Sequence, residues 1–137
     1  MSFLDIDTSD AKEPGVVEGG KEYKLTLVSY MTDENANMIR IGKKGQKFFM
    51  PVYRIETDEF VKSVSQYIEV PDKDAMDPAT YESKKLTLEK WKKCFGAPTG
   101  GFDLADLIGN SGFCILKVVH DDEYGDKNEI TKMMAGN

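Results

Sequence analysis

"GKKGQKFFMPVYRI", residues 42–55, places a glycine-containing turn directly before a run of aromatic and apolar residues. A turn of this kind next to β-forming residues predicts a hairpin, whose second strand would cover residues 47–56. Pro51 lies inside that strand and has no backbone N–H to donate, so we expect an edge strand or a bulge there. An edge strand could pair across a homo-oligomer or remain unpaired.

Positive charge is concentrated in the same region. The chain has a formal net charge of −6, from 18 basic and 24 acidic residues. Residues 36–55 contain five basic residues and no acidic one, so the remainder of the chain carries −11. Because local potential decides where a polyanion binds, we expect an anionic partner at this segment. Its basic residues are Arg40, Lys43, Lys44, Lys47 and Arg54.

Size and composition describe an ordinary globular protein. The chain has 137 residues, of which 40% are hydrophobic and 31% charged, which is enough for one core. No run of apolar residues approaches the roughly 18 that a membrane-spanning helix needs, and no secretory signal is recognisable, so we expect no membrane contact. Cys94 and Cys114 form no close motif and are expected to be reduced, partly buried thiols of an intracellular protein.

The N-terminal region differs in composition from the rest. Residues 1–20 hold five acidic residues, one proline and three glycines, which predicts a flexible acidic arm. Residues 21–137 then form the folded domain.

Alternation of apolar and polar residues predicts the strands of that domain. Residues 22–30 would bury Leu25 and Leu27 and place Tyr30 on the more polar face. A short strand is predicted at 38–42 and long ones at 47–56, 64–71, 112–120 and 129–134, that at 112–120 being of the fully buried kind.

One helix is predicted between the third and fourth long strands. Leu88, Trp91 and Phe95 share a helical spacing within residues 87–96, and Gly96 is a natural helix end. A single helical turn is also expected within residues 103–109. Three strands, a helix and two further strands are the order of the OB-fold, so we predict a mainly β, five-stranded OB-fold-like barrel, a fold that binds oligonucleotides or oligosaccharides.

Catalytic and metal-binding patterns are missing from the sequence. The single histidine, His120, accompanies no nucleophile motif, and one histidine with two distant cysteines cannot supply zinc spacing. The "DDEYGD" segment, residues 121–126, lacks the spacing of a calcium loop, and no phosphate-binding glycine motif occurs. We therefore expect neither an enzyme, nor a metal site, nor a cofactor.

Aromatic residues beside the basic segment indicate a binding surface. Alternation along residues 47–56 assigns Phe48, Met50 and Val52 to the core, and turns Phe49 and Tyr53 outward together with Tyr30. Stacking of a base on such a ring is worth about 1–3 kcal/mol without regard to sequence. Nearby cations would contact the phosphates. Rings and cations together predict binding of single-stranded nucleic acid.

Structural explanations compete with this interpretation. A bulge at Pro51 would invert the faces, burying Phe49 and exposing Phe48, and lysines are common at hairpin tips for solubility alone. A second basic patch, within residues 84–93, is expected to be a solvated helix face. The other aromatic residues expected in the core are Tyr23, Tyr67, Trp91 and Phe113.

Residues 16–134 resemble the phage single-stranded DNA-binding proteins of small OB-fold type. The resemblance rests on "VEGGKEYKLTLVSY" (17–30), on residues 42–55 and on "DLIGNSGFCILKVVHDDEYGDKNEITKM" (106–133). It implies binding of single-stranded DNA in the host cytoplasm during DNA replication or recombination, with proteins of those processes as partners. It also implies that the first strands bind through the five basic residues with Tyr30, Phe49 and Tyr53, and that Tyr124 and Lys127 of the closing hairpin flank the groove.

One departure from the resemblance concerns recruitment. Many proteins of this type end in an acidic tail, whereas residues 130–137 hold one lysine and no acidic residue. Tail-mediated recruitment is therefore not expected, although the acidic N-terminal arm could take that part. The alternative functions are a viral protein-interaction or virion structural module with a basic hairpin, and a cofactor subunit of a recombination or nuclease complex.

Overall fold

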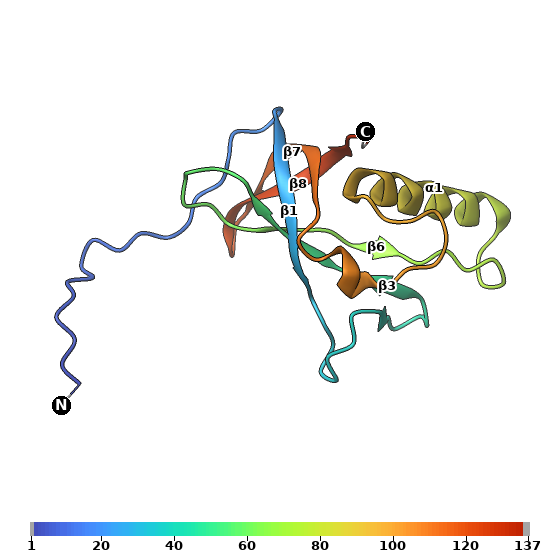
Figure 1. Ribbon diagram of the computed structural model, residues 1–137, viewed down its shortest axis with the longest axis horizontal. Helices are drawn as coiled ribbons and strands as arrows, with labels where there is room; N and C mark the ends of the chain where they lie inside the picture. Colours follow the sequence, from blue (N-terminus) through green and yellow to red (C-terminus); the bar gives the residue numbers. More distant parts are fainter. Residues whose placement is uncertain (1, 136–137) are drawn as a thin grey trace.

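Two antiparallel sheets are built around the predicted hairpin strand (Figure 1). The computed structural model describes residues 2–135. The larger sheet has the order β5 (Val64–Ser65), β4 (Pro51–Ile55), β1 (Glu22–Tyr30), β7 (Ser111–Asp121) and β8 (Gly125–Met133). The smaller sheet joins β2 (Arg40–Ile41), β3 (Lys47–Phe49) and β6 (Ile68–Glu69).

One long helix accompanies the sheets. Helix α1 covers Pro78–Phe95, and a short 3-10 helix, η1, covers Leu104–Leu107. The mainly β class with one α-helix is therefore confirmed. The long strand predicted at 64–71 was wrong, because this segment forms the two short strands β5 and β6, which belong to different sheets. Within residues 2–135 the hydrogen-bonded ladders leave the larger sheet open between β5 and β8.

The predicted strand 47–56 is divided at Met50. Its first part, β3, pairs with β2 and β6, and its second part, β4, pairs with β1 and β5. Pro51 begins β4 at the point where the chain passes from one sheet to the other. The irregularity expected at this proline is therefore present, because a residue without an N–H is tolerated where the ladder changes partner.

The outward assignment of Phe49 and Tyr53 was wrong, whereas the expected burial of Phe48 is confirmed at 8% exposure. Phe49, Pro51, Tyr53 and Ile55 are buried, with Phe49 at 2% and Tyr53 at 0% exposure. The Tyr53 hydroxyl accepts a hydrogen bond from Trp91 Nε1 at 2.8 Å and donates one to Gln66 Oε1 at 2.7 Å. A tyrosine whose hydroxyl is satisfied internally can be buried completely, which places Phe49 and Tyr53 in the core.

Tyr30 was also assigned to the wrong face. The pairing of β1 with β4 shifts register between Leu27 and Ser29, and this bulge turns Tyr30 inward. Its side chain is 6% exposed, and its hydroxyl donates to the Leu104 carbonyl oxygen at 2.7 Å. Alternation from Leu25 could not reveal this, because a bulge reverses the faces beyond it.

Aromatic side chains from α1 and the sheets form the centre of the core. The rings of Phe49 and Trp91 lie 4.9 Å apart, as do those of Tyr53 and Phe95. The predicted apolar face of the helix and its end at Gly96, in the left-handed conformation with φ of 75°, are confirmed.

Helix α1 starts at Pro78, well before the predicted residue 87. Asp77 caps it by accepting the Thr80 N–H at 2.7 Å. Its first two turns are largely exposed, so they carry no apolar periodicity from which to predict them.

Two expected core residues lie at the surface. Tyr67 is 47% exposed and Phe113 is 50% exposed. β7 alternates instead of being buried throughout, since Gly112, Cys114 and Leu116 point inward and Phe113 points outward. Both rings are therefore accessible at the surface, Phe113 on the larger sheet and Tyr67 between β5 and β6.

The N-terminal arm contacts the domain earlier than predicted. Gly15 bridges to Val61, and Val17 is 3% exposed, with its N–H bonded to Asn128 Oδ1 at 2.9 Å. Residues 2–13 are exposed and extend away from the sheets (Figure 1). Neither helix among residues 2–135 has the length and apolarity required to cross a membrane.

Candidate nucleic-acid interface

Three side chains stack on the outward face of the smaller sheet. Phe48 of β3 packs against Tyr67 with ring centroids 4.7 Å apart and planes inclined by 30°. The Arg40 guanidinium carbon of β2 lies 5.3 Å from the Phe48 ring centroid. Arg40 and Phe48 are cross-strand partners, so the strand pairing itself sets their contact. We call Arg40, Phe48 and Tyr67 the outer stack.

Tyr67 is the exposed aromatic ring of the outer stack. Phe48 is covered to 8% exposure by its two neighbours, whereas Tyr67 keeps 47% of its surface exposed. Arg40 is further held by an Nη1 contact of 3.7 Å to Met50 Sδ. The arrangement is a supported aromatic surface with a cation beside it, which can stack a planar ring.

The turn between β2 and β3 brings three lysines to the edge of this sheet. The Gly42 N–H donates to the Gln46 carbonyl oxygen at 2.8 Å, and Gly45 takes φ of 80°, a conformation that favours glycine. Lys43, Lys44 and Lys47 are all exposed.

One acidic residue lies on the outward face, and it is paired. Glu69 is the cross-strand partner of Phe48. Its carboxylate contacts Lys84 Nζ of α1 at 2.9 Å, so its charge is balanced locally. The Glu69 carboxylate is thus engaged by Lys84 of α1 and not by the lysines of the turn.

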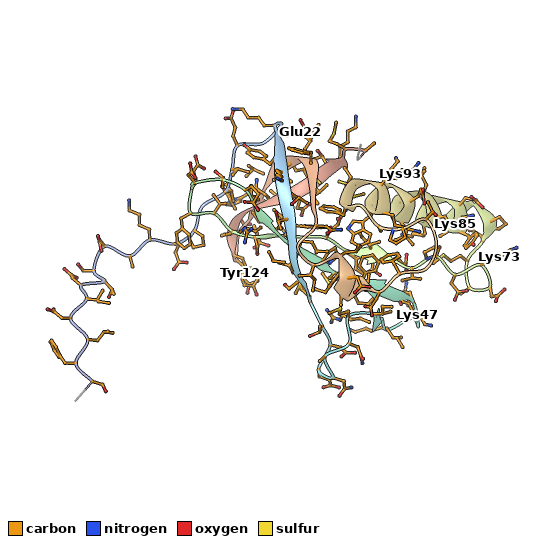
Figure 2. The ribbon with its side chains drawn as sticks, in the orientation of Figure 1. Glu22, Lys47, Lys73, Lys85, Lys93 and Tyr124 are labelled. Atoms are coloured by element: carbon orange, nitrogen blue, oxygen red, sulfur yellow. The ribbon has the colours of Figure 1, made fainter. Side chains whose placement is uncertain are left out.

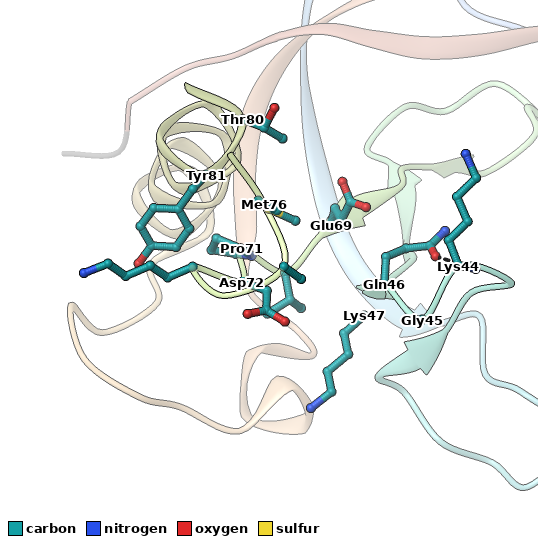
Figure 3. A pocket seen from close by; sticks show the side chains of 13 residues that line it. Lys44, Gly45, Gln46, Lys47, Glu69, Pro71, Asp72, Met76, Thr80 and Tyr81 are labelled. Atoms are coloured by element: carbon teal, nitrogen blue, oxygen red, sulfur yellow. Dashed lines mark hydrogen bonds between the residues drawn. The ribbon is translucent and has the colours of Figure 1, made fainter. Parts of the chain in front are cut away.

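A pocket of about 530 Å³ separates the lysine turn from the start of α1 (Figure 3). Lys44 and Lys47 line one wall, while Asp72, Lys73 and Tyr81 line the opposite one. The pocket adjoins the edge of the smaller sheet, since residues 44–47 and Glu69 are among its lining residues.

Three predicted site residues lie apart from this group. Arg54 is exposed on β4, where its Nη2 contacts Glu56 Oε1 at 2.9 Å. Hydrogen bonds from Thr26 and then from Arg54 lower the pKa of Glu56, so this acid stays charged beside the arginine. Lys127 contacts Glu129 at 3.6 Å, and Tyr124 is exposed at the β7–β8 turn. Figure 2 shows Tyr124 and Lys47 on opposite sides of β1.

The ten predicted site residues thus fall into three groups. Arg40 and the three turn lysines are brought together, whereas Tyr30, Phe49 and Tyr53 belong to the core. The residues that are exposed elsewhere are Arg54, Tyr124 and Lys127.

From the sequence, Phe48 and Tyr67 were both assigned to the core and were not brought together with Arg40. A signal for Tyr67 exists in the sequence, because Ser65 and Glu69 stand two residues away on either side of it. In a strand these three share one face, and two polar members predict that this face is exposed.

His120 belongs to a structured turn. Its ring contacts Asp126 Oδ1 at 2.7 Å and Asp122 Oδ1 at 3.1 Å, and the bond to Asp126 raises its pKa. Asp121 accepts the backbone N–H groups of Glu123 and Tyr124. Within residues 2–135 no three His, Cys, Asp or Glu side chains gather as a metal site would require.

Comparison of the sequence with models of known protein families gives no match, and comparison with curated proteins gives none either.

Proposed function

We propose that this protein binds single-stranded DNA with little sequence preference, on the outer stack and the lysines of the β2–β3 turn. The observation that carries the proposal is the half-exposed ring of Tyr67, supported by Phe48 and Arg40 beside a segment without acidic residues. A base would stack on Tyr67, and the neighbouring phosphates would contact Lys43, Lys44 and Lys47.

The physical basis is a division between rings and cations. Every base has a π-face, so stacking tolerates any sequence and contributes about 1–3 kcal/mol per base. Lysines that neutralise phosphates release counterions, which makes binding salt-dependent. Duplex DNA hides its base faces and should bind more weakly.

Strand order supports an OB-type barrel as the scaffold. The first long strand, β1, lies between the second and the fourth, with the third and fifth at the edges. Gln66 Nε2 at one edge reaches Met133 Sδ at the other, at 3.6 Å, which is consistent with a barrel that is nearly closed. In such a barrel the outer stack would occupy the sheet face that binds oligonucleotides.

The proposed setting is a phage protein of DNA replication or recombination in the host cytoplasm, without an enzymatic role. It would coat exposed single strands and meet proteins of those processes.

A fluorescently labelled oligo-dT tests the proposal by its anisotropy at low salt. Tyr67→Ala should weaken binding about 5–150-fold, since it removes one stacking partner worth about 1–3 kcal/mol. Tyr67→Phe keeps the ring and should bind like the wild type. Phe113→Ala, which removes a comparably exposed ring from β7, is the matched control. Equal affinity of Tyr67→Ala and wild type, or equal binding of duplex DNA, would contradict the proposal.

A protein-interaction module is the second candidate, and exposed apolar side chains favour it. Ile39 is 50% and Ile41 is 70% exposed beside the basic turn. A groove of about 690 Å³ between residues 36–39 and Phe102–Ala105 adds further apolar surface. No binding of oligo-dT at low salt would favour this candidate over the first.

A further inference from the structure

Two buried thiols face one another between α1 and β7. Cys94 belongs to the last turn of α1 and Cys114 to the first half of β7. Their Sγ atoms lie 3.9 Å apart, and both residues are buried and free. A disulfide needs about 2.05 Å between the sulfur atoms, so closing the pair requires a movement of about 2 Å.

Gly112 holds the end of the helix close to the strand. A Cβ atom added there would lie 2.6 Å from the Cys94 carbonyl oxygen and 2.7 Å from Cys94 Sγ. Only a residue without a side chain permits this approach. The backbone segments that carry Cys94 and Cys114 therefore lie close together.

The two thiols differ in access and acidity. A surface pocket of about 700 Å³ is lined by Cys94, Lys93 and Phe113, whereas Cys114 is not among its lining residues. The hydrogen bond from Cys114 lowers the pKa of Cys94, and the same bond together with burial raises the pKa of Cys114. A reagent that enters the pocket would thus meet the more acidic thiol first.

We propose that Cys94 and Cys114 form an oxidation site, which a hydroperoxide converts into an intramolecular disulfide. The Cys94 sulfur attacks the peroxide, takes one oxygen to become a sulfenic acid and releases water or an alcohol. The Cys114 sulfur then attacks Cys94, forming the S–S bond and releasing water with its own proton and the sulfenic hydroxyl. Each sulfur is oxidised by one electron, and the peroxide O–O bond takes up both.

The consequence of oxidation is a covalent link between the helix and the larger sheet. It closes a loop from residue 94 to 114 that contains η1. The outer stack contains neither cysteine, so this inference is independent of the proposed DNA binding.

Hydrogen peroxide applied to the full chain tests the proposal, with alkylation of remaining thiols, intact mass and peptide mapping as readouts. The mass of the wild type should fall by about 2 Da, and both cysteines should resist alkylation with or without denaturant. Reduction should restore both thiols. The link should raise the Tm by about 6–12 °C, as expected for a loop of this length. Cys114→Ser should stop at the sulfenic acid, which dimedone traps on Cys94. Cys94→Ser should keep a reduced thiol at Cys114.

Three outcomes would overturn it. They are a persistent dimedone adduct on Cys94 in the wild type, a disulfide that joins two chains only, and oxidation of Cys114 in Cys94→Ser at the wild-type rate. Circular dichroism of the untreated variants checks that they fold, and Cys114→Ala replaces Cys114→Ser if the latter does not.

Discussion

The burial of Tyr53 depends on contacts of its hydroxyl with two side chains distant in sequence, Gln66 and Trp91. Both faces of residues 47–56 are apolar, so hydropathy alone could not decide which one is buried. Partners distant in sequence decide it instead: Trp91 and Gln66 satisfy the Tyr53 hydroxyl inside the core. The lysines at the turn are exposed, as predicted, because lysine side chains are rarely buried.

Tyr53 consequently becomes a stability residue. Tyr53→Phe removes the acceptor of the buried Trp91 N–H and should lower the free energy of unfolding by about 1–3 kcal/mol. Urea denaturation followed by circular dichroism measures this, and the folded variant should bind oligo-dT as the wild type does. A weakened affinity at unchanged stability would instead return Tyr53 to the binding surface.

At the scale of elements, β1, β7 and the glycine turns were predictable because they depend on local pattern and on glycines. The exposed first half of α1 and the division of the hairpin strand between two sheets were not. The exposed half of α1 has no apolar periodicity. The division of the hairpin strand depends on pairing with β6, which lies about 20 residues away along the chain. The close approach of α1 to β7 is likewise invisible in the sequence, except as a glycine inside a strand.

Gly112 tests the packing of these two elements. Gly112→Ala should lower the free energy of unfolding by about 1–3 kcal/mol, because the new methyl group displaces the end of α1. Gly100→Ala is the matched control, since a Cβ atom there meets no other atom within 4 Å. Thermal unfolding of both variants gives the comparison, and equal Tm values would show that the helix end yields without cost.

Charge acts at the scale of the whole molecule. An acidic chain with one basic segment should hold a polyanion at that segment and repel it elsewhere. The sequence shows this asymmetry and led us to count Arg54 among five phosphate contacts. In the structure Arg54 lies on the larger sheet and is paired with Glu56. Arg40 belongs to the outer stack, so three lysines of the segment remain beside it.

Salt dependence measures how many of them contact phosphate. Contacts from the three lysines to a single strand give a slope of about −2.1 for log affinity against log salt, from about −0.7 each. Lys47→Ala should reduce its magnitude by about 0.7, whereas Lys127→Ala, whose lysine is paired with Glu129, should leave it unchanged. Equal slopes for all three proteins would place the phosphates elsewhere.

Two consecutive residues of β3 place aromatic rings on opposite faces of the strand. Phe48 faces outward in the outer stack, while the next residue, Phe49, faces inward and touches Trp91 at 4.9 Å between centroids. Trp91 is the chain's single tryptophan and has no exposed surface. The fluorescence of Trp91 should therefore report on the position of β3. A ligand that displaces β3 should change this emission without contacting the indole.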